Sequence, residues 1–403
     1  MLLLAGTIAL APFSLDVYIP AMPDMAAAFG VKVVQINYTM SIYLVGFGLG
    51  QIFGGPISDQ IGRRTLGLIG LSIYLLATLG IILSSSLEEL LILRGIQAIG
   101  GGFTTITVMP MIRDVYPVNE IGRRYSMVFM IMMIAPLFAP VIGVVLLQFN
   151  WHWVFLFLLG YAAIIWACFA FVLPETREQI RKLPDLRRIF PQYWQVISHK
   201  VDGRRISLRY GLTVALCGCV LMIYLTNASF IIQIYFGLPD HMFPVFFGSV
   251  VLGVALCNWV SMRKLNNMSL GKVAAYFRTG VRTQLIATSV LALAVFTEHT
   301  QIWLIFPCIV VVVAMLGITQ PSGSTLYLAE FKKLSGSATA LQTATLFSLG
   351  GLIGAISSTM NDDTLSAYAI ASLVVSLTAN LILLSIPKVA LDMPFNTEAE
   401  TMT

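Results

Sequence analysis

Twelve apolar runs follow one another along this chain, and they restrict its fold more than any other feature of the sequence. Each run holds about 18 to 24 residues, so a helix made from it crosses the roughly 30 Å hydrocarbon layer of a membrane. Charged residues make up 11% of the 403 residues, whereas an ordinary soluble domain has about 25%. We therefore expect an all-α membrane protein. Its twelve predicted transmembrane helices cover residues 2–20, 37–55, 65–84, 90–112, 125–147, 153–173, 209–233, 243–262, 279–297, 302–326, 337–359 and 366–386.

One long polar connection divides the runs equally, with six before it and six after it. This division predicts two pseudo-symmetric six-helix bundles, residues 1–173 and residues 209–386. Between the bundles, residues 174–208 form a basic linker that we expect to touch lipid headgroups on the cytoplasmic side. Residues 387–403 form a predicted cytoplasmic tail.

Lys and Arg are distributed unevenly among the connections. Connections after odd-numbered runs hold a single basic residue, Lys32. Nearly all the others of the 24 basic residues lie after even-numbered runs, in the linker or in the tail. Because short loops rich in Lys and Arg stay cytoplasmic, we predict an inner (plasma) membrane protein with both termini in the cytoplasm. The net charge of +5 follows from this topology, so no nucleic-acid partner is needed to explain it.

Two formally charged residues lie inside the predicted hydrocarbon, Asp16 in the first run and Arg94 in the fourth. The first run leads outward and the fourth leads inward, so both residues lie at a similar depth and could form an ion pair. A charge in hydrocarbon usually faces a partner or a cavity. The alternative is that Arg94 extends to the outer membrane surface. Gln97 and Gly101 share the helix face of Arg94, which favours a polar stripe along a cavity.

A buried carboxyl group beside a cation can exchange a proton near the working pH, because burial and the cation shift its pKa in opposite directions. We therefore expect Asp16 to carry protons, with Arg94 as its charge partner.

The connection between the second and third runs contains a recognisable motif. Gly55 and Gly62 allow a tight turn, while Asp59 and the two arginines can cap helix ends and bond neighbours such as Asp114. The segment resembles the signature G-x-L-A-D-x-x-G-R-[RK] of the major facilitator superfamily. That resemblance implies a latch at the cytoplasmic mouth, and the alternative is charge that only sets topology. The segment reads Gly55-Pro56-Ile57-Ser58-Asp59-Gln60-Ile61-Gly62-Arg63-Arg64.

Further segments resemble the drug:proton antiporters of the bicyclomycin-resistance (Bcr/CflA) branch of that superfamily. Arg94 begins a match to the family's fourth-helix motif, whose arginine is tied to proton coupling. The chain departs from the branch at Val144, where a second glycine is usual, and around Arg263, where the acidic residue is missing. The other matching segments are residues 15–23, 111–117, 334–341 and the fifth-helix antiport motif with Ala135, Pro136, Ala139, Pro140 and Gly143.

Small residues spaced by four predict close contacts between helices. Such spacing occurs at Gly46, Gly50 and Gly54, and again at Gly350 and Gly354. In the superfamily fold the second and eleventh helices meet, so the resemblance implies that these stripes are the surfaces that rock. A multispecific cavity needs apolar and aromatic walls with few polar groups. The candidates for such a cavity are Phe13, Tyr43, Gln97, Asn227, Phe230, Gln233 and Gln320.

The resemblance implies proton-coupled efflux of small amphipathic drug-like compounds, with the proton gradient as energy source and no cofactor. We expect a monomer in the lipid bilayer. The sequence contains no zinc-protease, P-loop or nucleophile-elbow motif, so an enzyme or a metal site is not expected. Proton-coupled uptake of a small metabolite and a non-transporting sensor with a transporter fold are the alternatives.

Overall fold

The computed structural model describes residues 2–176, 189–200, 204–265, 268–331, 334–360 and 364–386. The predicted tail and much of the predicted linker, residues 177–188 and 201–203, lie outside this part of the chain. Twelve described segments are long and apolar enough to cross a membrane, as predicted. The helices are α1 (Leu2–Asp16), η1 (Ile19–Ala21), α2 (Met22–Phe29), α3 (Val33–Ile61), α4 (Arg63–Leu83), α5 (Leu87–Thr105), α6 (Val108–Val115), α7 (Val118–Leu147), α8 (His152–Phe171), α9 (Ile189–Ser198), α10 (Ile206–Ser229), η3 (Phe230–Tyr235), η4 (Asp240–Met242), α11 (Phe243–Leu265), α12 (Leu270–Phe296), α13 (Ile302–Ala314), α14 (Leu316–Leu328), α15 (Ser335–Thr359) and α16 (Ser366–Leu384).

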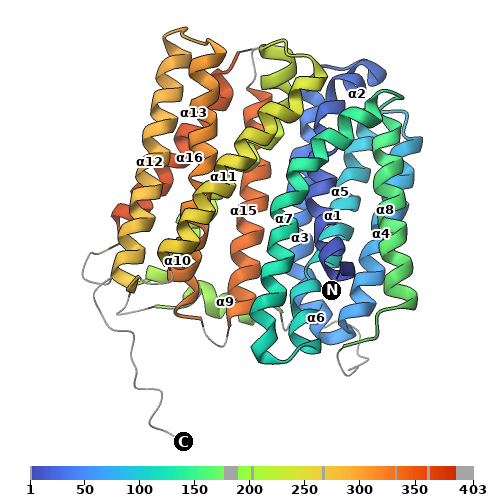
Figure 1. Cartoon of the computed structure of the whole chain (residues 1–403), viewed down its shortest axis with the longest axis vertical. Coiled ribbons are helices and arrows are strands. Elements are labelled where there is room, and N and C mark those ends of the chain that lie inside the picture. Colours follow the sequence, from blue (N-terminus) through green and yellow to red (C-terminus); the bar gives the residue numbers. More distant parts are fainter. Residues whose placement is uncertain are drawn as a thin grey trace, which may run out of the picture.

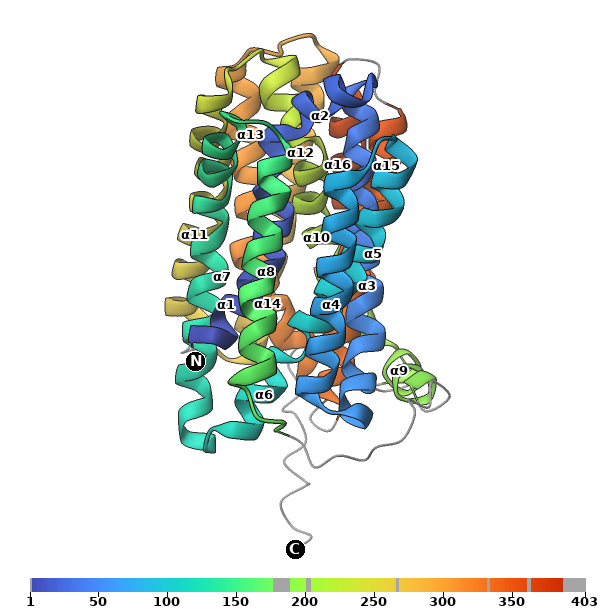
Figure 2. The same ribbon diagram turned by 90° about the vertical axis from the view of Figure 1, so that its right-hand side faces the viewer.

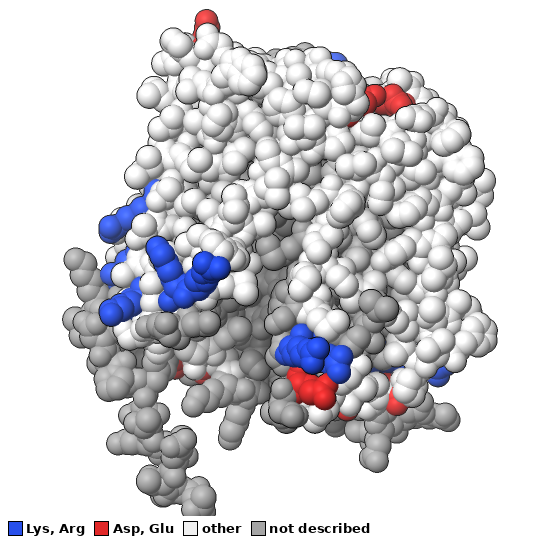
Figure 3. Space-filling view, in the orientation of Figure 1, with Lys and Arg blue, Asp and Glu red and all other residues white. Residues whose placement is uncertain are grey.

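Two helical bundles stand side by side (Figure 1). Helices α1 to α8 form the first bundle, and α10 to α16 form the second. We call the end that carries the α3–α4 and α11–α12 connections the basic end, because Lys and Arg gather toward it (Figure 3). The opposite end, which carries α2 and η4, is the far end.

Several membrane spans are not single regular helices. The first span consists of α1, η1 and α2, and the fourth consists of α5 and α6. The tenth span is α13 followed by α14, and the seventh ends in η3, a short π-helix. Breaks of this kind expose backbone groups that neighbouring helices can bind.

Two helices show the largest differences from the predictions. Helix α12 begins at Leu270, earlier than the expected start at residue 279, because charged residues lowered the hydropathy of its first turns. As a result Lys272 and Arg278 lie on a helix and not in a loop. The second difference is α9, which lies within the predicted linker and was not expected.

The bundles meet along two pairs of helices, which we call the α3–α15 seam and the α7–α11 seam. The predicted glycine stripes do not form the α3–α15 seam. Added Cβ atoms at Gly46 and Gly50 would meet α5, and one at Gly350 would meet α10, so these glycines pack inside their own bundles. The seam instead uses Gly48, which lies against α15, and Gly351, which lies against α3.

Candidate functional site

The first membrane span is broken directly after Asp16. Helix α1 ends there, and Val17 and Tyr18 are not helical. Pro20 and Pro23 lack the N–H groups that would continue the helical hydrogen bonds, which explains the break. The break leaves the Asp16 carboxylate at a helix end inside the span, where the residue is 4% exposed.

Arg94 of α5 is fully buried in the first bundle at the level of this break. Its Nη1 donates to Oε1 of Gln97 at 2.6 Å, and its Nη2 donates to the backbone oxygen of Ser14 at 3.2 Å. Its guanidinium carbon lies 4.2 Å from the ring centre of Tyr18 and 4.4 Å from that of Tyr43. Aromatic faces and a carbonyl oxygen thus stabilise this cation.

The expected ion pair between Asp16 and Arg94 is absent from this structure. Both residues are described, and no nitrogen–oxygen contact within 4.0 Å joins them. Their similar depth was predicted correctly, since Arg94 reaches Ser14, but the carboxylate does not face the arginine.

Gln97 belongs to a hydrogen-bond chain that the sequence did not reveal in full. Its Nε2 donates to Oγ1 of Thr78 at 2.7 Å, and that hydroxyl donates to the Tyr74 carbonyl. The Tyr74 hydroxyl bonds in turn to Oγ of Ser14 at 2.6 Å. This chain fixes Arg94 and the end of α1 in one geometry. In the sequence, the polar residue Ser14, two positions before Asp16, was the sign of this hydrogen-bond chain.

The fifth-helix motif packs α7 against the break in the first span. A Cβ atom at Gly143 would collide with the Val17 carbonyl oxygen, so glycine is required for this contact. Ala139 is fully buried, and Pro136 and Pro140 lie inside the helix. Ala135 lines an apolar pocket between α1, α7 and α8. The predicted packing role of this motif therefore has a defined place, beside Asp16.

The predicted cavity residues do not meet in one place. Phe13 lines the same lateral pocket as Ala135, with its ring 5.2 Å from that of Tyr161. Tyr43 is fully buried and covers the Arg94 guanidinium. Gln320 donates to the Val214 carbonyl at 3.0 Å inside the second bundle.

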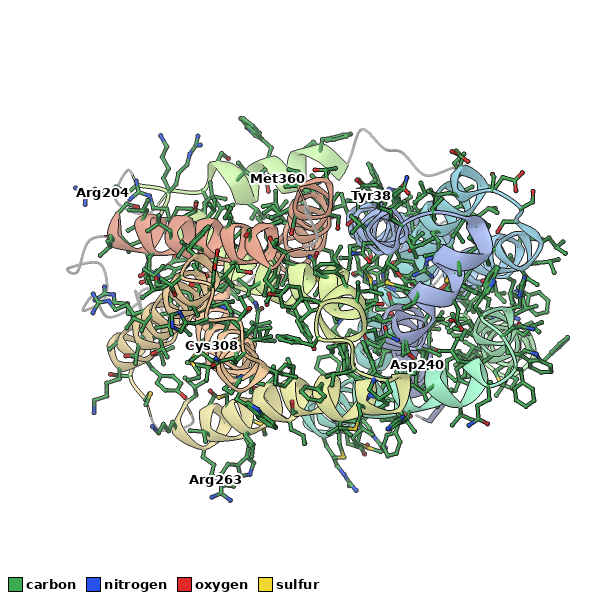
Figure 4. The ribbon with its side chains drawn as sticks, turned by 90° about the horizontal axis from the view of Figure 1, so that it is seen from above. Tyr38, Arg204, Asp240, Arg263, Cys308 and Met360 are labelled. Atoms are coloured by element: carbon green, nitrogen blue, oxygen red, sulfur yellow. The ribbon has the colours of Figure 1, made fainter. Side chains whose placement is uncertain are left out.

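The remaining candidates lie along the seventh span. Asn227 is buried and donates to the Ile223 carbonyl at 2.8 Å, and Phe230 is also buried. Gln233 joins the bundles at the far end, because its Nε2 donates to the Pro20 carbonyl at 3.0 Å and to Oδ1 of Asp240 at 2.8 Å. Seen from above, Asp240 stands at the boundary between the bundles (Figure 4).

Three of the predicted latch residues, Asp59, Arg63 and Asp114, meet at the basic end. Arg63 pairs with Asp59 at 2.5 Å and with Asp114 at 3.4 Å, and it also donates to the hydroxyl of Ser58. Gly62 has a φ of +104°, which only glycine adopts readily. Gly55 lies in α3 beside Ile106, which follows the end of α5. These contacts tie α3 to α4 and α6 within the first bundle.

The sequence did not reveal Glu175, which follows α8. Its carboxylate accepts the backbone N–H groups of Arg63, Arg64 and Thr65, and so caps the N-terminus of α4. Arg64 donates to the last carbonyls of α8 in return. Helices α4 and α8 thus cap each other. In the sequence, an acidic residue close after a membrane helix was the sign of this cap.

Known proteins are similar to this chain over most of its length. The model of the Major Facilitator Superfamily matches residues 4–355. Multidrug resistance protein D of Escherichia coli is 36% identical over 178 residues, which span 44% of this chain and 45% of that protein. The bicyclomycin resistance protein homolog of Haemophilus influenzae is 22% identical over 88% of this chain and 87% of its own length. Chloramphenicol resistance protein CraA of Acinetobacter baumannii is 27% identical over 75% of this chain and 72% of its own length.

Solved structures agree with the fold. A POT family transporter crystallised with a thioalcohol-conjugated peptide superimposes with a TM-score of 0.74 and 15% identity, covering 95% of this chain and 94% of that one. The xylose transporter XylE of Escherichia coli gives a TM-score of 0.68 with 13% identity, covering 96% and 97%. The chain is therefore a multi-pass membrane protein that belongs to the Major Facilitator Superfamily.

Proposed function

We propose that the protein exports small amphipathic, drug-like compounds across the inner membrane in exchange for protons. Family membership supports a small-molecule substrate. The names of three relatives, for multidrug, bicyclomycin and chloramphenicol resistance, support drug-like compounds as that substrate. The proton gradient supplies the energy, and no cofactor is required.

The buried Asp16 carboxylate is the observation that carries this proposal. It is buried at the break of the first span, and no described cation forms an ion pair with it. An intramembrane carboxyl group without a counter-charge favours a change of protonation as its surroundings change. Arg94 serves as the nearby fixed cation, held by Tyr18 and Tyr43 while Asp16 loads and unloads.

We place the basic end in the cytoplasm, together with both termini. The distribution of Lys and Arg supports this orientation. Residues 1–173 and 209–386 are then the two rocking bundles, the linker and the tail are cytoplasmic, and the contacts of Asp59, Arg63 and Asp114 form the inner latch. A monomer suffices for this mechanism.

Everted membrane vesicles test the proposal. Vesicles that contain the protein are given a panel of amphipathic compounds, with and without an imposed gradient that is acidic inside. Accumulation of some compounds that collapses with the gradient is the expected result. Accumulation of a metabolite only in right-side-out vesicles would favour uptake, and accumulation of nothing under any gradient would favour a sensor.

A further inference from the structure

Helix α9 lies crosswise to the membrane helices at the basic end, on the outer side of the α3–α15 seam (Figures 2 and 4). Its sequence divides into two faces. Tyr193 and Val196 are buried against the protein, with 7% and 1% exposure. Phe190 and Trp194, by contrast, are 64% and 65% exposed. Helix α9 is therefore amphipathic, with one face against the protein and one face exposed.

Tyr193 fills a defined gap in α3. Pro56 lies inside that helix and has no N–H group, so the carbonyl of Ile52, four residues earlier, lacks its helical donor. The hydroxyl of Tyr193 donates to this oxygen at 2.8 Å. Burial and the carboxylate of Asp59 raise the pKa of Tyr193 to about 12, so the hydroxyl keeps its proton in the physiological range.

The same helix also contacts the second bundle. The Tyr193 ring packs in a cluster that joins Ile52 of α3 to Ala340 and Leu341 of α15. One residue earlier, Gln192 accepts a hydrogen bond from Ser337 of α15 at 3.2 Å. Beyond the end of α9, His199 lies 3.8 Å from Glu330 of the second bundle. Helix α9 therefore bridges the seam.

The outer face of α9 matches the membrane surface in chemistry and in place. The helix lies across the spans at their basic end (Figure 2), and the ends of membrane spans are where hydrocarbon gives way to headgroups. Tryptophan and phenylalanine are favoured at this boundary, and basic residues near it attract anionic headgroups. Lys200, Arg204 and Arg205 follow α9 directly.

We propose that α9 is an interfacial clasp, with Tyr193 seated on the Ile52 carbonyl at the α3–α15 seam, and Phe190 and Trp194 inserted among lipid headgroups. The clasp fastens the two bundles together along this seam and anchors the seam to the membrane surface. It goes beyond the proposed transport activity, and the measurements below do not depend on transport.

Hydrogen exchange of the full chain in nanodiscs of phosphatidylethanolamine and phosphatidylglycerol tests the inner face. Tyr193→Phe removes only the hydroxyl, so exchange of α9 should quicken by roughly two- to tenfold, the effect of one hydrogen bond. Tyr161→Phe is the matched control, because that hydroxyl donates to the Gly6 carbonyl at 2.7 Å within the first bundle. The control should leave α9 unchanged.

Pro56→Ala supplies the missing N–H group and separates the clasp from a general loss of stability. In that background Tyr193→Phe should alter α9 exchange by less than about twofold, because the Ile52 carbonyl then has its helical donor. Unchanged exchange after Tyr193→Phe alone would overturn the inner contact. An equal effect in both backgrounds would also overturn it.

Fluorescence tests the outer face in the same nanodiscs. The Trp194 signal is the difference between wild type and Trp194→Phe. Phospholipids brominated near the top of their acyl chains should quench this signal, and aqueous acrylamide should quench it little. Strong quenching by acrylamide and none by brominated lipid would place Trp194 in water, which rules out the membrane anchor.

Discussion

The two seams between the bundles occupy equivalent places in the fold, yet they are built differently. Helices α3 and α15 run closely together, and Gly48 and Gly351 leave no room for a Cβ atom at this seam. Helices α7 and α11 approach each other toward the far end and diverge toward the basic end (Figure 1). A hollow between the bundles is visible on this side of the surface (Figure 3). One seam is thus closed and clasped, and the other is open at one end.

The absence of a side chain at Gly351 lets α15 lie close to the α3 backbone, whereas Gly248 of α11 has no close neighbour. A Cβ atom at Gly351 would lie 2.7 Å from the Ser41 carbonyl oxygen. At Gly248 of α11, nothing lies within 4 Å of an added Cβ atom. Between membrane helices, packing replaces the hydrophobic effect as the main attraction, so close contact is what holds α3 to α15.

Gly351→Leu should have the largest effect on this difference. Its side chain would force α15 away from the α3 backbone, which should lower the free energy of unfolding by about 3 kcal/mol. Gly248→Leu should change it by less than about 0.5 kcal/mol. Thermal denaturation of the purified proteins in detergent measures both. Equal destabilisation by the two variants would contradict the claim that close packing at Gly351 holds α15 to α3.

Phe47→Ala should weaken the same seam to a smaller degree. The Phe47 ring meets that of Phe347 edge to face, with 4.9 Å between their centres. The interaction between the two rings, taken from a double-mutant cycle of Phe47→Ala and Phe347→Ala in the same denaturation assay, should be roughly 1.5 kcal/mol. Phe138→Ala on α7 is the control, because Phe138 is 59% exposed and should change stability little. A larger loss from the control would show that the seam does not depend on this pair.

Ser348→Ala should have the smallest effect on the free energy of unfolding, and unlike the variants above it should not lower it. The Ser348 hydroxyl is buried against Gly48 and has no hydrogen-bond partner among the described residues. Its removal should leave stability unchanged or raise it by up to about 1 kcal/mol. Ser14→Ala is the comparison, since that hydroxyl bonds to Leu10 and Tyr74, and its loss should destabilise the protein. Clear destabilisation by Ser348→Ala would reveal a polar contact in the seam.

The depth of a residue within the membrane could be predicted from the sequence, but the direction in which its side chain leaves the helix could not. The apolar runs fixed the twelve spans, and the helical rise correctly brought Arg94 to the level of Ser14. Whether Arg94 faced Asp16 depended on how α1 and α5 rotate against their neighbours, which periodicity in one chain does not specify. The glycine stripes do mark close helix contacts, as predicted, but their implied place in the seam was wrong for the same reason, because Gly46 and Gly48 lie on one helix and face different partners.

The contacts that the sequence missed are made between segments far apart in the chain. Glu175 caps a helix that begins at Arg63, and Tyr193 donates to a carbonyl that Pro56 leaves without its helical donor. Each pair could be recognised only after the fold brought it together. The latch residues were easier, since Asp59 and Arg63 are one helical turn apart and form a local motif.

Proton release on substrate binding tests the role of Asp16 most directly. Purified protein in weakly buffered detergent near neutral pH receives a saturating amount of a compound that everted vesicles accumulate, and a pH indicator follows the solution. Wild type should release protons, whereas Asp16→Asn should bind the compound and release none. Equal proton release from Asp16→Asn would show that another group carries the proton, and would contradict the proposed coupling.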